Sequence, residues 1–192
     1  MILTSEEIKK TLQDYSNKNT KISRDVKSGK LIKLKNGLYE TNPNTKGYLL
    51  AGSIYGPSYL SFDFVLAYHG LIPTKNIIYT SATCNKKKKK LYENNFGKYS
   101  YRDVPENVFA LGINKIEEEG YKFYLATPEK ALCDKLYTLS PIKNMKELTD
   151  ILLDEFEIDM DELLGVNMDH LQEITESYHS TNVTLFYRYM KK

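Results

Sequence analysis

The sequence has no tryptophan, only three histidines and only two cysteines among its 192 residues. Cys84 and Cys133 show no CxxC or Cys/His ligand spacing, and His69, His170 and His179 are too far apart for a zinc motif. The chain also lacks a Gly-rich phosphate loop, a Gly-x-Ser-x-Gly elbow and a Cys/His nucleophile pair. We therefore expect no metal, no cofactor and no enzymatic activity.

Long apolar runs are missing as well. No stretch has the length and apolar character of a transmembrane helix, and the first residues lack the pattern of a secretory signal. We expect a cytoplasmic protein that makes no membrane contact and keeps its two cysteines as buried free thiols.

The net charge is only +2, but the charges are distributed unevenly. Residues 17–36 contain six lysines and one arginine against Asp25 alone. Residues 144–179 contain eleven acids, and Lys146 is their only lysine or arginine. This asymmetry indicates a polyanion-facing N-terminal part and an acidic C-terminal part with a different role.

Two short helices are predicted near the N-terminus. Apolar residues at helical spacing indicate a first helix over residues 5–15, and a second over residues 21–28 ends at Gly29. Their expected caps are hydroxyl or amide side chains, Thr4 or Ser5 for the first helix and Asn19 or Thr20 for the second.

A basic hairpin follows these helices. Asn36-Gly37 separates two alternating runs, residues 31–35 and 38–41, and Asn-Gly in this setting is a strong hairpin signal. Two helices followed by a basic hairpin are the order of a compact winged helix-turn-helix. We expect a further helix over Tyr48–Ile54 to complete its helical bundle.

The remaining chain mixes helices and strands. The expected elements are a helix over 62–69 capped by Ser61, a strand over 77–84, a hairpin over 91–104, a strand over 121–126, a helix opened by Thr127-Pro128-Glu129, and acidic or amphipathic helices near 145–156, 169–178 and 182–190. We predict an α+β protein. A winged helix-turn-helix DNA-binding module covers residues 1–44, and a mixed α/β partner-binding domain with a small sheet and C-terminal helices covers residues 45–192.

Several segments resemble one known family. Lys33–Tyr39 resembles the wing of the AbiEi family of type IV toxin–antitoxin antitoxins, and so does Tyr48–Gly56 followed by Pro57–Ser61. Leu66–Leu71 is similar to that family's A-L-x-x-x-G-L helix end, and Ala126–Asp134 is similar to its A-x-P-E-K-A-L-x-D segment. The chain departs from the family in having only two helices before the wing, and its acidic C-terminal third matches no part of it.

The resemblance implies a DNA-binding antitoxin of an abortive-infection (phage defence) system. Such a protein represses its own transcription and counteracts a nucleotidyltransferase toxin encoded beside it. Its partners would be double-stranded operator DNA, the toxin, and a second copy of the chain on DNA. Two other hypotheses stay open, a stand-alone winged-helix repressor without a toxin and an enzyme acting on nucleic acid or nucleotides.

The second helix and the hairpin supply the candidate DNA contacts. A helix in the major groove needs side chains that reach base edges, together with cations that neutralise phosphates. The alternative is a solvated helix whose lysines serve solubility. The candidate DNA-binding residues are Thr20, Lys21, Ser23, Arg24, Lys27, Lys30, Lys33, Lys35 and Asn36.

A run of five lysines is a candidate secondary phosphate contact. It consists of Lys86, Lys87, Lys88, Lys89 and Lys90. The alternatives are a mobile, solvated loop and a hairpin edge that the lysines protect against pairing with other chains.

Three further groups of side chains have structural interpretations. Lys130 and Asp134 are spaced as an (i, i+4) ion pair on a capped helix, which favours structure over catalysis. His69 is expected in the last turn of a helix, where a protonated imidazole favours the dipole. Four tyrosines are expected to pack in the core with solvated hydroxyls, with a partner interface as the alternative: Tyr48, Tyr55, Tyr59 and Tyr68.

Overall fold

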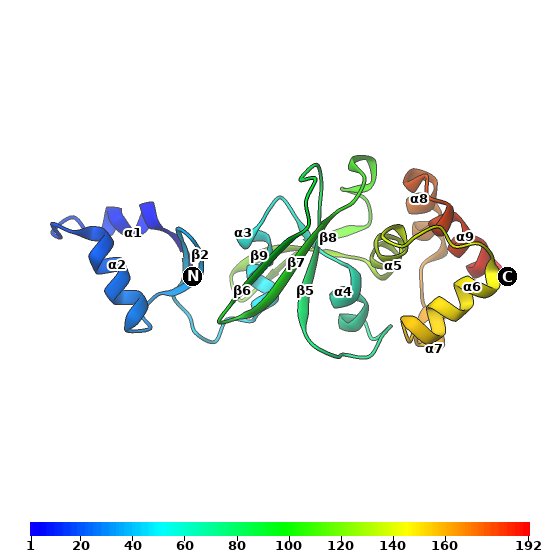
Figure 1. The fold of residues 1–192 in the computed structure, drawn as a ribbon, viewed down its shortest axis with the longest axis horizontal. Coiled ribbons are helices and arrows are strands. Elements are labelled where there is room, and N and C mark those ends of the chain that lie inside the picture. The colour runs from blue at the N-terminus through cyan, green and yellow to red at the C-terminus, as the bar shows by residue number, and fades with distance from the viewer.

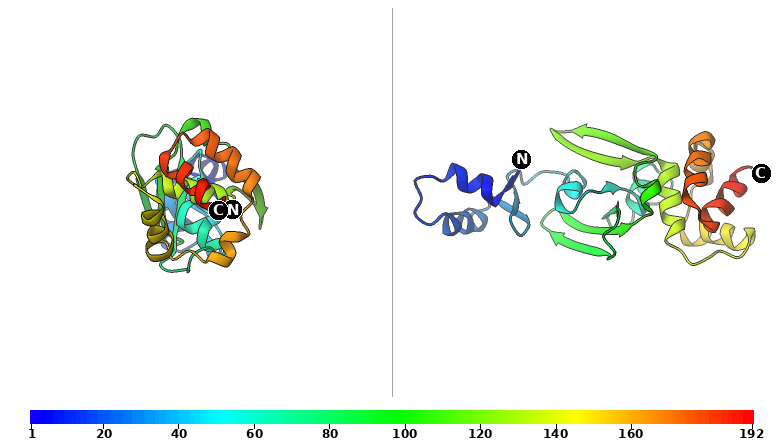
Figure 2. Two further views of the ribbon diagram at one scale, coloured as in Figure 1. Left: turned by 90° about the vertical axis from the view of Figure 1, so that its right-hand side faces the viewer. Right: turned by 90° about the horizontal axis from the view of Figure 1, so that it is seen from above.

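The structure, a computed structural model, describes residues 1–192 and shows a mixed α+β fold with two sheets. The molecule is elongated (Figures 1 and 2). A small N-terminal module lies at one end, a six-stranded sheet lies in the middle, and a group of helices lies at the C-terminal end.

The N-terminal module consists of a helix pair and a three-stranded sheet. Its elements are β1 (Ile2–Thr4), α1 (Ser5–Thr11), α2 (Lys18–Lys27), β2 (Ile32–Lys35) and β3 (Leu38–Glu40). The predicted hairpin is confirmed, and its second strand also pairs antiparallel with β1, so the strand order is β1-β3-β2. Ile8, Ile22 and Leu31 form a small core between the helices and the sheet.

Helix α1 begins at Ser5 with Thr4 as its cap, as predicted, but two other predicted helix boundaries in this module were wrong. Helix α1 ends at Thr11 instead of Tyr15, and in its last turn the Thr11 hydroxyl donates to the carbonyl of Ile8 (2.8 Å). Helix α2 begins at Lys18, where the side chain of Asn17 accepts a hydrogen bond from the N–H of Thr20 (3.1 Å). The cap is therefore Asn17 and not Asn19 or Thr20.

The third helix expected for the N-terminal bundle packs elsewhere. Residues 47–54 form a 3₁₀ turn, η1 (Gly47–Leu50), and a short helix, α3 (Ala51–Ile54). Both cover the central sheet, where the hydroxyl of Tyr99 donates to the carbonyl of Gly47 (3.1 Å) and that of Tyr101 to the carbonyl of Ala51 (2.7 Å). The N-terminal bundle therefore has two helices, and strand β1, which the sequence pattern did not predict, is its additional element.

The central sheet has six strands in the order β6-β7-β5-β4-β9-β8. They are β4 (Tyr59–Leu60), β5 (Ile78–Thr83), β6 (Lys90–Asn94), β7 (Gly97–Asp103), β8 (Ile113–Glu118) and β9 (Tyr121–Ala126). The predicted β6–β7 hairpin and the strands β5 and β9 are confirmed, although the first residues of the predicted 77–84 strand are exposed instead of buried. Edge strand β8 was not predicted.

Helices flank this sheet and form the C-terminal end. They are α4 (Phe62–Tyr68), η2 (Glu106–Val108, 3₁₀), α5 (Pro128–Tyr137), α6 (Met145–Asp150), η3 (Ile151–Glu155, π-helical), α7 (Met160–Leu164), α8 (Met168–Tyr178) and α9 (Thr181–Met190). The three predicted C-terminal helices are confirmed, and α7 is an addition. Sheet and helices share a core of 37 buried residues.

None of the helices combines the length and the apolar character that crossing a bilayer requires. The two cysteines are free thiols, as expected, but only Cys133 is buried, because Cys84 is partly accessible to solvent.

Candidate nucleic-acid interface

Helix α2 presents four of the candidate residues as one exposed stripe. At about 100° per residue, Thr20, Ser23, Arg24 and Lys27 fall within an arc of about 100°, and all four side chains are exposed. Ile22 lies on the opposite side of the helix and is buried in the small core. The module therefore turns one polar, cationic surface of α2 toward solvent.

Lys21 lies outside this stripe. Its ammonium forms an ion pair with Asp25 one turn later, and both side chains are partly buried. It also lies 5.7 Å from the centre of the Tyr15 ring. Lys21 therefore braces the flank of the helix, and its charge is already matched within the chain.

The hairpin has one face toward solvent and one toward the central sheet. Leu34 and Leu38 belong to the large core, and the side chain of Asn94 on β6 donates to the carbonyl of Leu34 (3.2 Å). The ammonium of Lys35 donates to the carbonyl of Ile54 (2.5 Å), whereas Lys33 is exposed. Lys35 therefore joins the module to the rest of the molecule.

The tip of the hairpin lies against the start of α1. Gly37 has a positive φ of 78°, as an Asn-Gly turn requires, and its carbonyl accepts a hydrogen bond from the N–H of Ser5 (2.9 Å). Asn36 is exposed beside it, and Lys30 is exposed in the turn that follows α2. Asn36 and Lys30 are therefore accessible, together with Lys33 and the α2 stripe.

The lysine run has a more limited role than its composition suggests. Lys86 donates to the carbonyl of Gly56 (3.3 Å) and lies 5.5 Å from the centre of the Tyr55 ring. The backbone N–H of Lys87 donates to the carboxylate of Asp103 (2.6 Å). The loop is thus tied to the body at two points, while the ammonium groups of the last four lysines are exposed at the start of edge strand β6.

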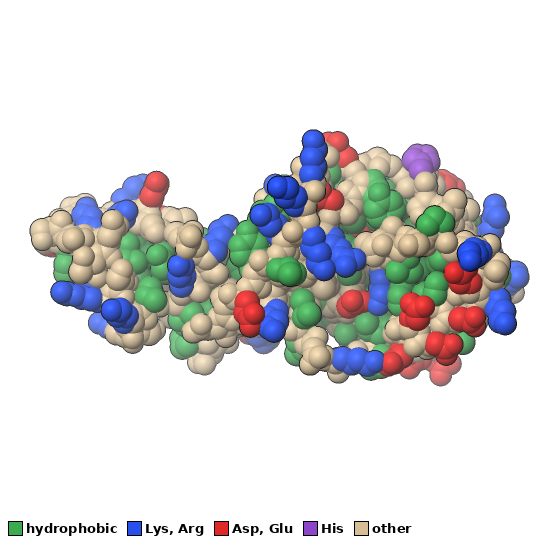
Figure 3. Space-filling model, in the orientation of Figure 1, with side chains coloured by type: hydrophobic (Ala, Val, Ile, Leu, Met, Phe, Trp, Pro, Cys, Tyr) green, Lys and Arg blue, Asp and Glu red, His purple; other side chains and the backbone are tan.

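The space-filling view shows how the charges divide. Lysine and arginine side chains spread over the N-terminal module and the β6–β7 hairpin, whereas aspartate and glutamate gather over α6 and α7 (Figure 3). The uneven charge along the sequence is therefore also uneven in space.

Lys130 and Asp134 form the predicted (i, i+4) ion pair, and the structure places it in the interior. The ammonium lies 2.7 Å from the carboxylate, and both side chains are 0% exposed. Asp134 also accepts hydrogen bonds from Tyr59 (3.0 Å), Ser61 (2.5 Å) and Tyr178. Burial and the nearby Asp134 carboxylate raise the pKa of both tyrosines, so their hydroxyls remain donors.

The surroundings of Ser61 and His69 differ from those predicted. Ser61 does not cap α4 through its side chain, because its hydroxyl is committed to Asp134. His69 lies at the C-terminal end of α4, but burial lowers its pKa, and its Nε2 is buried without a hydrogen-bond partner. The imidazole is therefore protonated less readily than a free histidine, which weakens the positive charge expected there.

Of the four tyrosines, three are packed inside and one is exposed. Tyr59 is buried, and Tyr48 and Tyr55 pack against the core with neighbouring aromatic rings. The hydroxyl of Tyr48 donates to Glu118 (2.8 Å), and burial together with that carboxylate raises the pKa of Tyr48 to about 12. Tyr68 is largely exposed.

The sequence was compared with protein-family models and with curated proteins. No protein-family model matches the chain, and no curated protein matches its sequence.

Proposed function

We propose that this protein binds double-stranded DNA through α2 and represses transcription from its own promoter. The observation that carries the proposal is the exposed stripe of Thr20, Ser23, Arg24 and Lys27 on a helix whose opposite side is buried. A helix of this kind fits the major groove, where side chains near its N-terminus reach base edges.

The topology of the module supports this proposal. The order strand, helix, helix, strand, strand, with β1 paired to β3, is compatible with a winged helix-turn-helix that lacks its first helix. In that arrangement α2 has the place of the recognition helix, and the β2–β3 hairpin has the place of the wing.

The chemistry of the exposed side chains assigns some of them to base contacts and the others to phosphate contacts. Arg24 has the planar guanidinium that pairs with guanine through two hydrogen bonds, and Thr20 and Ser23 offer hydroxyls to bases or phosphates. In this proposal the surrounding phosphate contacts come from Lys27, Lys30, Lys33 and Asn36. The first three are cations, and all four residues are exposed.

The resemblance to AbiEi antitoxins extends the proposal to the rest of the chain. Residues 45–192 would neutralise a nucleotidyltransferase toxin encoded beside this protein, while the module represses the shared promoter. If no such toxin gene exists, the repressor function remains and the antitoxin function is withdrawn.

The decisive experiment measures binding of the full chain to DNA upstream of its own gene and to a scrambled duplex. Three exposed cations assigned to phosphates, Lys27, Lys30 and Lys33, predict a slope of log K against log salt of about −3. A variant with Thr20→Ala and Arg24→Ala should lose the preference for the promoter. A matched variant with Lys115→Ala and Lys122→Ala, on the distant β8–β9 hairpin, should keep it. A slope near zero and equal affinity for both duplexes would refute DNA recognition.

A further inference from the structure

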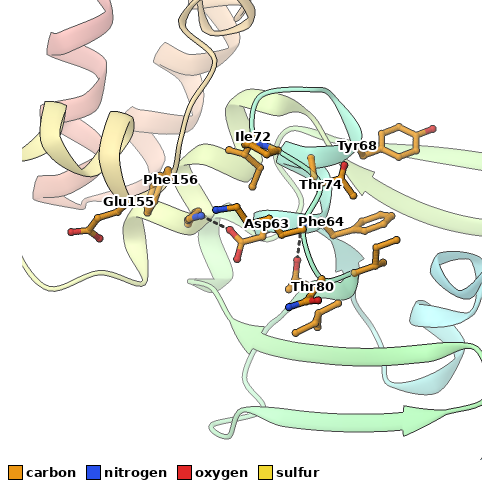
Figure 4. A pocket seen from close by; sticks show the side chains of 15 residues that line it. Asp63, Phe64, Tyr68, Ile72, Thr74, Thr80, Glu155 and Phe156 are labelled. Carbon is orange, nitrogen blue, oxygen red and sulfur yellow. Dashed lines mark hydrogen bonds and ion pairs between the residues drawn. The ribbon is translucent and has the colours of Figure 1, made fainter.

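A groove runs along one face of the central sheet. It consists of two adjoining cavities of about 460 and 690 Å³ that share Asp63, Ile78, Thr80 and Lys135. The first, shown in Figure 4, lies between α4, the loop before β5, and the end of η3. The second lies over β5, β6 and β7. The opposite face of these strands is covered by η1 and α3, so only the groove face is open.

The groove exposes apolar side chains. Ile78 is 40% exposed and Leu91 is 69% exposed, and both lie on its sheet surface. Ile77 and Tyr68 are exposed farther along the same groove. Exposed apolar residues that gather in one concave surface, with polar residues around them, mark an interaction site.

The rim of the second cavity is cationic. Lys89, Lys98, Arg102 and Lys135 line it. Lys98 lies 3.7 Å from Glu93 and Lys135 is paired with Asp63, whereas Lys89 and Arg102 form no ion pair within the chain. Residues 85–102 as a whole hold seven cations and one acid. We call this second cavity, together with its cationic rim, the basic groove.

The same chain carries the complement of this groove. Residues 150–164 contain seven acids and no lysine or arginine, and Figure 3 shows acidic side chains gathered over α6 and α7. Two leucines are exposed among them, Leu153 at 42% and Leu164 at 77%. This acidic segment, residues 150–164, thus combines exposed leucines with acidic neighbours, as the basic groove combines exposed apolar residues with cations.

We infer that the basic groove of one molecule binds the acidic segment of a second copy of this chain. Charge and apolar character match on both sides, and the two surfaces adjoin in one molecule, where the Lys135 ammonium lies 3.8 Å from the centre of the Phe156 ring. Because each molecule carries both surfaces, two copies can exchange reciprocal contacts in a closed pair, or further copies can add in an open chain. The contact uses neither α2 nor the wing and does not depend on the proposed DNA binding.

Sedimentation velocity of the full chain, without DNA, tests the contact. The average mass should rise with protein concentration at low salt and fall toward the monomer at high salt, because ions screen exposed charges. A chain that stays monomeric at every concentration and salt would overturn the inference.

Charge-reversal variants test whether the basic groove and the acidic segment form the contact. The groove variant, Lys89→Glu with Arg102→Glu, and the segment variant, Asp154→Lys with Asp161→Lys, should each raise the Kd of self-association by about tenfold or more, because like charges then face each other. An equimolar mixture of the two variants should associate again, since each supplies a surface that the other has reversed. That rescue would not follow from general damage to the fold.

The control variant is Lys115→Glu with Lys122→Glu, which changes the net charge as much as the groove variant does but lies on the β8–β9 hairpin. It should associate like the native chain. The inference fails if the control weakens association equally, or if the mixture shows no rescue. It also fails if the groove variant loses affinity for DNA while its self-association is unchanged, because the groove would then bind nucleic acid.

Discussion

Asp134 accepts hydrogen bonds from four side chains in the interior of the molecule, and one of them is a buried ammonium. Removing one partner of such a cluster leaves the other charge buried and unmatched. We expect Asp134→Ala to lower the free energy of unfolding by about 3–5 kcal/mol, measured by denaturant titration.

The Lys21–Asp25 pair is the matched control, because it has the same spacing but is only partly buried. Asp25→Ala should cost well under about 1 kcal/mol. Similar costs for Asp25→Ala and Asp134→Ala would show that the buried cluster has no special weight in stability.

Arg24 distinguishes base recognition from phosphate binding. A bidentate contact to one guanine is worth about 1–3 kcal/mol of discrimination, so Arg24→Ala should weaken promoter binding by that amount and random DNA much less. Lys27→Ala should weaken both duplexes alike, as the loss of a phosphate contact does. The measurement is fluorescence anisotropy at one fixed salt concentration. Equal losses on both duplexes for Arg24→Ala would make Arg24 a phosphate contact.

Some residue roles lie beyond what sequence spacing can indicate. The spacing of Lys130 and Asp134 predicts their (i, i+4) pair, but only the fold reveals that the pair is buried and that Tyr59, Ser61 and Tyr178 surround it. These partners are 44 to 75 residues away along the chain. Local periodicity carries no information about such distant contacts.

At the scale of elements, the features that depend on a few neighbouring residues, such as turns and helix caps, could be predicted from the sequence. Asn36-Gly37 gave the β2–β3 hairpin, and the cap, proline and acid at Thr127-Pro128-Glu129 gave the start of α5. Strand β8 was missed because it is an edge strand whose alternate residues, including Lys115 and Glu117, are exposed and polar. The position of the helical segment over Tyr48–Ile54 was predicted, but its packing partner was not. An apolar helix face does not indicate which part of the protein it contacts, and this one packs on the central sheet.

The β2–β3 hairpin also separates two lysines that the sequence treats alike. Lys33 is exposed, whereas Lys35 donates to the carbonyl of Ile54. We expect Lys33→Ala to flatten the slope of log K against log salt by about 0.9, the contribution of one phosphate. Lys35→Ala should leave the slope unchanged and instead lower the free energy of unfolding, by about 1 kcal/mol for a lost hydrogen bond. Binding titrations across salt concentrations test both, and a flatter slope for Lys35→Ala would place Lys35 on DNA.

At the scale of the whole molecule, the two parts have very unequal cores. Only three buried residues form the core of the N-terminal module, whereas 35 of the 37 residues of the large core come from residues 45–192. The exceptions, Leu34 and Leu38, come from the hairpin and pack against the body. The module therefore depends on the body more than the body depends on the module.

Residues 45–192 expressed alone should fold and unfold cooperatively, as circular dichroism during heating would show, because they retain nearly the whole large core. Their midpoint should be lower than that of the full chain, since the surface that Leu34 and Leu38 cover becomes exposed. If a nucleotidyltransferase is encoded beside this gene, the fragment should also restore growth when it is co-expressed with that enzyme.

The comparison with the full chain separates the outcomes. A folded fragment that fails to restore growth, while the full chain succeeds, would place part of the neutralising surface in the N-terminal module. Failure of both proteins would withdraw the antitoxin function and leave the repressor. A fragment that does not fold would show that Leu34 and Leu38 are indispensable to the body, and full-length variants at these two positions should then lose the same cooperative transition.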